Sequence, residues 1–287
     1  MKAHLQIVIP AYNEASRIGA TIENLMAELS KRTEHIQVLV VLNGCKDDTL
    51  EVVESYRKLY PDKIIVQDHR EPLGKGRAII HGFKMCTAEY VSFMDADGSV
   101  SASSVLSLLD RIGQYDAAIG SRRCDGAKIL VKQPWPRHVA GRAYAWLTRL
   151  LLGLPFCDTQ CGGKIFKKEV ADVIASNCTE YGWAFDVAML DIILLKGFTV
   201  KELPIIWTND DRSKIKLFKD GFQMLKSLLR LRYSKRTVEY KNVLMLQHHF
   251  INQGTYKRCY KFAEHLASQA RHISIVCVDT KMNGFWP

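Results

Sequence analysis

The sequence lacks three features that would each assign it to a familiar class of protein. Its 287 residues contain no apolar run near the roughly 18 residues that a membrane-spanning helix needs. The eight cysteines include no CxxC pair of the metal-binding type. No recognisable nucleic-acid-binding motif is present, and few aromatic residues are interleaved with the basic ones. These absences favour a soluble or membrane-peripheral protein that does not bind nucleic acid.

The cysteines that are present indicate a reducing compartment. Cys86, Cys178 and Cys277 stand among apolar neighbours, as the packed thiols of a cytosolic protein do. Cys157 and Cys161 could bind a metal, but no second Cys/His pair accompanies them. The N-terminal residues lead directly into an apolar segment, so we expect no signal peptide and a cytoplasmic location.

The net charge of +10 is concentrated in one part of the chain. Residues 214–241 hold nine Lys or Arg and two Asp or Glu. Within them, residues 215–233 have the spacing of an amphipathic helix with an almost purely cationic polar face. Its apolar face could pack against the domain, or the helix could dock on an anionic membrane surface, which we expect. A phosphorylated lipid or a membrane surface suits this charge better than nucleic acid does.

Short apolar segments alternate with amphipathic ones through the first 120 residues. This rhythm predicts an α/β protein with a doubly wound, mostly parallel sheet, whose ligands gather at the carboxyl ends of the strands. The predicted strands are 5–9, 37–42, 63–66, 90–94 and 116–120, and the predicted helices are 16–31, 49–59, 76–86 and 101–115.

Two later segments allow more than one interpretation. Residues 132–154 read as a loop and a helix with Trp146 and several leucines beside Arg142 and Arg149, which is either a core-facing helix or one that meets a lipid. Residues 237–287 read as one βαβ unit, with strands at 242–246 and 273–278 and a helix at 255–269. We expect a first domain over 1–236, followed by the truncated start of a second domain rather than a packed tail.

The paired acids Asp95 and Asp97 flank Ala96 at the end of an apolar strand and precede Gly98. Two carboxylates one residue apart can share Mg²⁺ or Mn²⁺, which then bridges to substrate phosphates. A polar strand end with turn-forming residues gives the same triplet. Metal-assisted chemistry on a diphosphate is the interpretation that the neighbouring segments favour.

A second polar group follows the first two predicted strands. After Pro10 and Ala11, Tyr12 could pack near a nucleobase and Glu14 could accept a hydrogen bond from a ribose hydroxyl. Asn43, beyond the second strand, could contact a base edge. Taken one at a time, each of these residues is equally consistent with an ordinary turn or a helix cap.

Four motifs, taken together and in their order along the chain, resemble the nucleotide-sugar-binding half of inverting GT-A glycosyltransferases. The resemblance is strongest to the polyprenyl-phosphate hexosyltransferases, and among them to the dolichyl-phosphate β-glucosyltransferases, and it covers residues 1 to about 236. The four motifs are 10–14 (PAYNE), 43–49 (NGCKDDT), 74–76 (GKG) and 95–97 (DAD), and the β-glucosyltransferase likeness adds 158–164 (DTQCGGK), 183–186 (WAFD) and 207–214.

The resemblance implies roles for individual residues on the donor side. Asp97 would bind the metal directly, and Asp95 would contact the ribose or the metal. Arg212 and Lys214 would neutralise the diphosphate leaving group, and Lys75 would reach the sugar or a phosphate. The implied donor-binding set is Pro10, Ala11, Tyr12, Glu14, Asn43, Lys75, Asp95, Ala96, Asp97, Arg212 and Lys214.

On the acceptor side, Arg122, Arg137 and Lys164 are candidates for binding an acceptor phosphate, and Gln160 is a further acceptor contact. A phosphate monoester has a second pKa of about 6, so it attacks without needing to lose a proton to a base. A sugar hydroxyl would need a carboxylate base, for which Asp158 and Asp186 are the candidates. Asp186 could equally cap a helix.

The resulting prediction is a metal-dependent inverting hexosyltransferase that moves glucose from UDP-glucose to a polyprenyl phosphate, on the cytosolic face of a membrane. GDP-mannose as donor, a saccharide hydroxyl as acceptor, and a non-catalytic nucleotide-sugar sensor remain alternatives. A nucleotidyltransferase is disfavoured because no glycine-rich phosphate loop follows the first strand. Two departures from the family pattern stand out: the second strand ends in Leu42 and Asn43 in place of a paired acid, and we expect no anchor helix from these residues. The C-terminal βαβ segment resembles the start of a GT-B domain.

Overall fold

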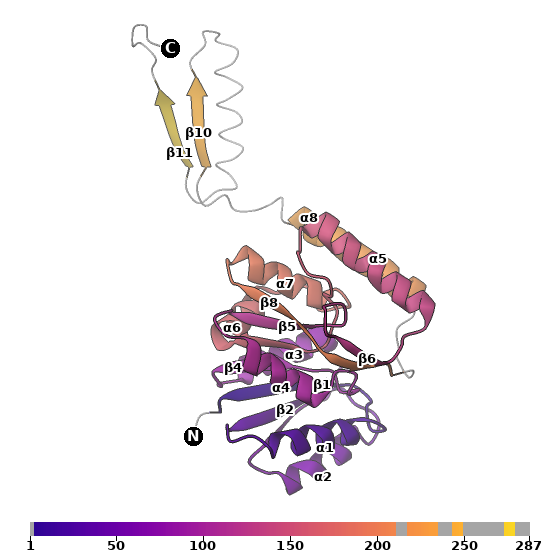
Figure 1. The fold of residues 1–287 in the computed structure, drawn as a ribbon. Helices are drawn as coiled ribbons and strands as arrows, with labels where there is room; N and C mark the ends of the chain where they lie inside the picture. The colour runs from indigo at the N-terminus through magenta and orange to yellow at the C-terminus, as the bar shows by residue number, and fades with distance from the viewer. Residues whose placement is uncertain (1–2, 211–216, 235–242, 249–272, 279–287) are drawn as a thin grey trace. The chain divides into compact units, whose positions relative to one another are not determined.

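The computed structural model describes residues 3–210, 217–234, 243–248 and 273–278. The chain forms two units, Met1–Leu229 and Arg230–Pro287. The first unit is built on a seven-stranded sheet with the order β3-β2-β1-β4-β7-β5-β8 (Figure 1). The predicted α/β class with a mostly parallel sheet is therefore confirmed.

Four neighbouring strands form the parallel part of the sheet. They are β1 (Leu5–Ala11), β2 (Ile36–Asn43), β3 (Ile64–His69) and β4 (Tyr90–Phe93). In β1 and β2 nearly every residue is buried, because helices cover both faces, and such strands read as continuous apolar runs. Leu5 is paired with Ile36 on one side and with Tyr90 on the other, so the carboxyl ends of β1, β2 and β4 meet at one edge.

The other half of the sheet contains elements that the sequence patterns did not indicate. β7 (Lys164–Lys167) runs antiparallel between β4 and β5 (Ala117–Ser121), and β8 (Val200–Pro204) pairs with β5 in parallel. β6 (Lys128–Val131) and β9 (Ile206–Thr208) form a separate two-stranded sheet. Because β7 runs antiparallel to β4, the end of the 158–164 motif lies beside the acids that follow β4.

Helices cover the two faces of the sheet. On one face lie α1 (Ile18–Leu29), α2 (Thr49–Leu59) and α4 (Ala102–Arg111), which bury an aliphatic core against alternate residues of β1 and β2. On the other face lie α3 (Lys75–Met85), α6 (Lys168–Asn177) and α7 (Phe185–Leu195), with an aromatic cluster of Phe83, Phe93, Phe166 and Phe185.

α3 lies especially close to β1. A Cβ at Gly82 would overlap with both methyl groups of Val8, so only glycine allows this approach. The close packing fixes the position of α3 against the sheet. The first residue of α3, Lys75, is thereby held at the same sheet edge as the acids that follow β4.

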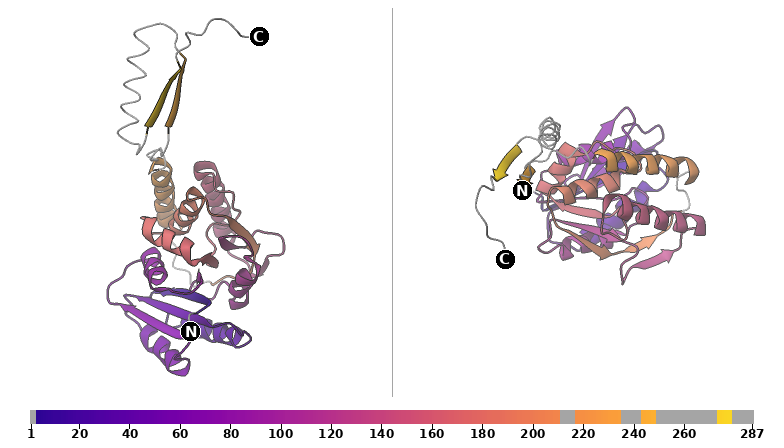
Figure 2. Two further views of the ribbon diagram at one scale, coloured as in Figure 1. Left: turned by 90° about the vertical axis from the view of Figure 1, so that its left-hand side faces the viewer. Right: turned by 90° about the horizontal axis from the view of Figure 1, so that it is seen from above.

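The predicted helices within 132–154 and 215–233 are confirmed as α5 (Trp135–Leu152) and α8 (Leu217–Ser234). α5 and the part of α8 in the first unit lie side by side in Figures 1 and 2. Only Thr148 and Leu152 of α5 are buried, which is less than a core-facing helix would bury. Among the described residues no helix is long and apolar enough to cross a membrane.

In the second unit, β10 (Val243–His248) and β11 (Ile273–Val278) pair in parallel, from Val243 with Ile273 to His248 with Val278. Both predicted strands of the βαβ segment are therefore present. The helix predicted at 255–269 lies outside the described residues. The division of the chain into domains at residue 236 stays a prediction.

Candidate active site

The candidate site lies where β1, β2 and β4 end. β4 stops at Phe93, and the turn that follows it holds Asp95, Ala96 and Asp97. The hydroxyl of Thr21 on α1 donates a hydrogen bond to the carbonyl of Ala96 at 2.8 Å, which fixes this turn against the first helix. The paired acids are thereby held next to the residues that follow β1.

Lys75 pairs with the first of the two acids. Its Nζ lies 2.6 Å from Oδ1 of Asp95 and 5.9 Å from the centre of the Phe93 ring. Burial alone would lower the pKa of Lys75, but the charges of Asp95 and then Asp186 outweigh burial and raise it. Lys75 is therefore a fixed cation beside Asp95, and its predicted contact with the sugar or a phosphate stays a prediction.

Asp97 has a different environment. Its Oδ1 accepts a hydrogen bond from the backbone N–H of Ser99 at 2.9 Å. Burial, followed by the negative charge of Asp95, raises the pKa of Asp97, whereas the pair with Lys75 leaves the pKa of Asp95 lowered. Two neighbouring carboxylates that repel each other in this way are a suitable oxygen donor set for a hard divalent cation.

On the other side of the turn, Arg17 connects two acids from distant parts of the chain. Its Nη2 donates to Oε1 of Glu14 at 2.7 Å, and its Nη1 donates to Oδ2 of Asp210 at 3.1 Å. Asp210 is the last described residue before Arg212 and Lys214, which lie outside the described residues. No sequence motif singled out Arg17, although its spacing of three residues from Glu14 is a usable signal for a pair at the start of a helix.

The remaining donor-side residues lie around the ends of β1 and β2. Pro10 and Ala11 close β1, with Ala11 buried, and Tyr12 is exposed beyond them. Asn43 is buried, and its Oδ1 accepts a hydrogen bond from the backbone N–H of Leu73. This bond favours a role for Asn43 in holding the segment before α3.

On the acceptor side, Arg122 follows β5 and binds Asp158. Nε and Nη2 of Arg122 lie 2.6 and 2.8 Å from the two carboxylate oxygens, and the backbone N–H of Arg122 adds a third bond. The guanidinium also lies over the ring of Trp207, at 5.3 Å. Burial would raise the pKa of Asp158, but the charge of Arg122 holds it down at about 2.

Lys164 and Asp186 form a second buried pair. Nζ of Lys164, which is 0% exposed, lies 2.6 Å from Oδ1 of Asp186 and also donates to the carbonyl of Cys161. Asp186 is in the first turn of α7. The structure thus places Lys164 in the interior, where it holds Asp186 in position.

Other residues complete the surroundings of the site. Gly162 lies so close to Asp95 that a Cβ there would overlap with Oδ2. The guanidinium of Arg123 donates to the carbonyl of Cys157 at 2.7 Å. The hydroxyl of Tyr144, on α5, is buried in the same half of the unit, whereas Arg137 is half-buried in the first turns of α5.

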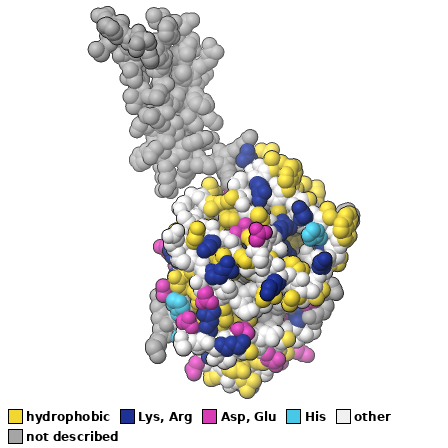
Figure 3. Space-filling model, in the orientation of Figure 1, with side chains coloured by type: hydrophobic (Ala, Val, Ile, Leu, Met, Phe, Trp, Pro, Cys, Tyr) yellow, Lys and Arg dark blue, Asp and Glu magenta, His cyan; other side chains and the backbone are white. Residues whose placement is uncertain are grey.

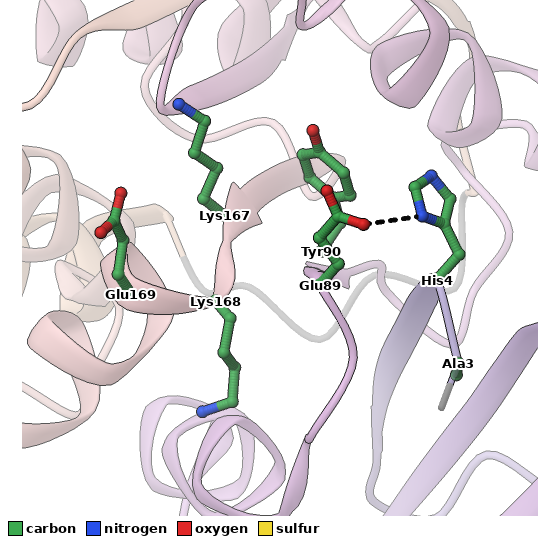
Figure 4. A pocket seen from close by; sticks show the side chains of 7 residues that line it. All are labelled: Ala3, His4, Glu89, Tyr90, Lys167, Lys168 and Glu169. Atoms are coloured by element: carbon green, nitrogen blue, oxygen red, sulfur yellow. Dashed lines mark hydrogen bonds and ion pairs between the residues drawn. The ribbon is translucent and has the colours of Figure 1, made fainter. Parts of the chain in front are cut away.

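A separate hollow lies at the opposite edge of the sheet. It is formed at the amino ends of β1 and β4, where His4 pairs with Glu89 at 3.2 Å (Figure 4). The parallel strands run from this edge toward Asp95, so the hollow is separate from the candidate site. Its lining consists of Ala3, His4, Glu89, Tyr90, Lys167, Lys168 and Glu169.

Comparison with known proteins supports the same fold. The chain resembles a crystal structure of glucosyl-3-phosphoglycerate synthase from Mycobacterium tuberculosis in complex with UDP, with a TM-score of 0.60, 18% identity and 80% of each chain covered. The complex of that enzyme with Mn²⁺, UDP and glucosyl-3-phosphoglycerate also gives a TM-score of 0.60, with 16% identity and 80% of each chain covered. The sheet and its two helical layers are those of the GT-A fold.

The sequence relatives identify the family. The family model for Glycosyl transferase family 2 matches residues 6–174, and the chain belongs to that family. It is 31% identical to glycosyltransferase AglD of Haloferax volcanii over 231 residues, which are 79% of this chain but only 36% of AglD. It is also 31% identical, over 244 residues, to dolichyl-phosphate beta-glucosyltransferase of Homo sapiens (80% and 75% covered). The corresponding protein of Dictyostelium discoideum is 27% identical over 242 residues (80% and 74% covered).

Proposed function

We propose that this glycosyltransferase moves a hexose from a nucleotide-sugar to a polyprenyl or dolichyl phosphate, with inversion at the anomeric carbon. UDP-glucose is the first donor, in keeping with the relatives named dolichyl-phosphate beta-glucosyltransferase. The observation that supports a phosphate acceptor is that both candidate bases are already paired with cations. Asp158 is paired with Arg122 and Asp186 with Lys164, each at 2.6 Å, so both carboxylates are committed to buried ion pairs.

A phosphate acceptor suits a site with that feature. A sugar hydroxyl has to transfer its proton during the attack, whereas a phosphate monoester with a second pKa of about 6 is already mostly dianionic at neutral pH. One phosphate oxygen attacks the anomeric carbon, and the bond from that carbon to the diphosphate breaks. The leaving nucleoside diphosphate takes the electron pair, and an α-linked donor gives a β-linked product.

The donor set at the strand ends fits a divalent cation. Asp97 and Asp95 would hold Mg²⁺ or Mn²⁺, which would neutralise the charge that develops on the leaving diphosphate. Arg17 holds Glu14, the candidate ribose contact, through two guanidinium bonds. Lys75 orients Asp95 from the far side of the turn.

A lipid acceptor requires contact with a membrane, which we place on the surface formed by α5 and α8. On α5, Trp135, Trp146 and Leu150 are 76, 62 and 61% exposed, and Phe222 on α8 is 72% exposed. In Figure 3 hydrophobic side chains gather, with Lys and Arg among them, where Figure 1 draws α5. Exposed aromatic and basic residues on one surface are typical of peripheral binding to an anionic bilayer, here on its cytosolic face.

The experiment is nucleotide release by the purified protein, with UDP-glucose and GDP-mannose, each with and without a short polyprenyl phosphate. UDP release that depends on the lipid phosphate and on Mn²⁺ or Mg²⁺ supports the proposal. Asp97→Asn should abolish that release, whereas Asp62→Asn, in the exposed loop before β3, serves as a matched control. GDP release would move the donor to GDP-mannose. Donor binding without turnover would favour a sensor, and release stimulated only by a saccharide would replace the acceptor.

A further inference from the structure

The hydroxyl of Tyr144 is an unsatisfied polar group in the interior of the first unit. It is inaccessible to solvent, and no hydrogen-bond partner for it exists among the residues that the structure describes. The same holds for Nε2 of Gln160. Buried polar groups in folded proteins nearly always have partners, so such orphans call for a ligand.

Tyr144 lies on the inward side of α5. It shares that side with Thr148 and Leu152, the two buried residues of the helix, each four residues further along. Trp135, Trp146 and Leu150 occupy the exposed side. α5 thus separates the outer apolar surface from the interior position of this hydroxyl.

Among the described residues, two acids act on the Tyr144 hydroxyl. Burial, followed by the negative charges of Asp186 and then Glu180, raises the pKa of Tyr144. Asp186 is held by Lys164, which also binds the carbonyl of Cys161, the neighbour of Gln160. The charge of Asp186 also reaches Lys75, whose partner is the metal-site acid Asp95.

This arrangement indicates what kind of ligand the orphan groups accept. Beside these acids a neutral sugar hydroxyl suits the phenol better than a phosphate does, because a hydroxyl can accept from the phenol and also donate to a carboxylate. Asp186 lies near the proposed diphosphate site, because its partner Lys164 and the partner of Asp95, Lys75, lie 5.3 and 5.9 Å from the centre of the same Phe93 ring. A hexose attached to a diphosphate at Asp95 and Asp97 would therefore come within reach of this region. The acceptor phosphate would instead be recognised by the cationic residues that follow β5, Arg122 and Arg123.

We propose that Tyr144 binds the transferred hexose of the nucleotide-sugar, by a hydrogen bond between its buried hydroxyl and a hydroxyl of the sugar. The inference rests on the proposed function for the presence of a nucleotide-hexose donor. It adds a specificity-determining residue from α5, the same helix that carries the exposed apolar surface.

The test compares the affinities of UDP-glucose and UDP, measured by calorimetry in the presence of Mn²⁺, for the wild type, Tyr144→Phe and Tyr60→Phe. UDP lacks the hexose, so Tyr144→Phe should weaken UDP-glucose binding by about tenfold and leave UDP binding unchanged. Tyr60, which is exposed just after α2, should behave as the wild type with both ligands.

Two outcomes would overturn the inference: unchanged affinity for UDP-glucose, or an equal loss of affinity for UDP and UDP-glucose. Because the readout is donor binding, it does not depend on turnover. A wild type that binds UDP-glucose but never transfers it would refute the proposed function and leave this inference standing. If the wild type prefers GDP-mannose, the same selective loss must appear between GDP-mannose and GDP.

Discussion

Arg122 and Asp158 form a buried two-point ion pair, with Nε and Nη2 of the arginine 2.6 and 2.8 Å from the two oxygens of the carboxylate. The Asp158 side chain is 2% exposed, and the backbone N–H of Arg122 binds it as well. Both oxygens therefore have donors in the absence of substrate. This geometry favours a role for Asp158 in positioning Arg122 beside the acceptor, and it leaves little opportunity for Asp158 to act as a base.

The first prediction concerns the removal of the Asp158 charge. Asp158→Asn leaves the buried Arg122 guanidinium without a counter-charge, so we expect the free energy of unfolding to fall by about 3 kcal/mol. Urea unfolding followed by tryptophan fluorescence measures this change, with Asp62→Asn as a control of the same chemistry on the exposed surface. A variant that is fully stable, yet inactive with any acceptor, would instead identify Asp158 as a base.

The second prediction concerns Gly162, whose backbone approaches Asp95. In Gly162→Ala the new Cβ would overlap with Oδ2 of Asp95, so the carboxylate or the chain must shift at the proposed metal site. We expect kcat/KM to fall at least about tenfold, which corresponds to about 1.4 kcal/mol of transition-state stabilisation. Unchanged activity together with an unchanged Mn²⁺ requirement would show that Asp95 does not have to keep this position.

The third prediction concerns metal removal. Without a cation, the carboxylates of Asp95 and Asp97 stand at the place where the donor diphosphate would bind, so chelation with EDTA should lower UDP affinity at least about tenfold. Added Mn²⁺ or Mg²⁺ should restore it. In Asp97→Asn, UDP binding should no longer respond to the metal. Equal UDP affinity with and without the metal in the wild type would show that the cation takes no part in donor binding.

The fourth prediction concerns acid stability and a residue far from the chemistry. Asp116 accepts hydrogen bonds from the backbone N–H and the hydroxyl of Thr199, at 2.9 and 2.7 Å, and pairs with Lys167. The backbone bond, followed by the bond from Lys167, holds the pKa of Asp116 at about 2, below the usual value of about 3.9.

Because the folded-state pKa of Asp116 is depressed, its contribution to stability is complete above about pH 4 and is lost as the pH falls toward about 2. After allowance for its partial exposure, that contribution is about 1 kcal/mol. The difference in unfolding free energy between the wild type and Asp116→Asn should therefore shrink by most of that amount when the pH falls from about 6 to about 2.5. A difference independent of pH would contradict the assignment.

The parallel half of the sheet follows from local sequence, because buried parallel strands are continuous apolar runs. The strands β1, β2 and β4 stand out for that reason, and the apolar run that ends just ahead of Asp95 is enough to place the paired acids at a strand end. The antiparallel β7 has only four residues and begins with Lys164, which a sequence pattern assigns to the surface. α7 is buried on nearly all sides and has no amphipathic period, so the sequence indicates it only by an apolar run that follows a possible helix cap at Asp186.

The ion pairs of the site could not be predicted in the same way, because their partners come from distant segments. Arg122 and Asp158 are 36 residues apart, and Lys164 and Asp186 are 22 apart. The motifs named the residue types and their order along the chain. Only the packing of β5, β7 and α7 shows which carboxylate neutralises which cation.

The most direct test of the proposed reaction is the structure of its product. The protein is incubated with UDP-glucose, a short polyprenyl phosphate and Mn²⁺, and the lipid fraction is analysed by mass spectrometry and by proton NMR of the anomeric centre. We expect a lipid phosphate heavier by one hexose residue, with a β-linked glucose. An α-linked product would contradict inversion, and glucose found only free in water or on a saccharide would contradict the lipid-phosphate acceptor.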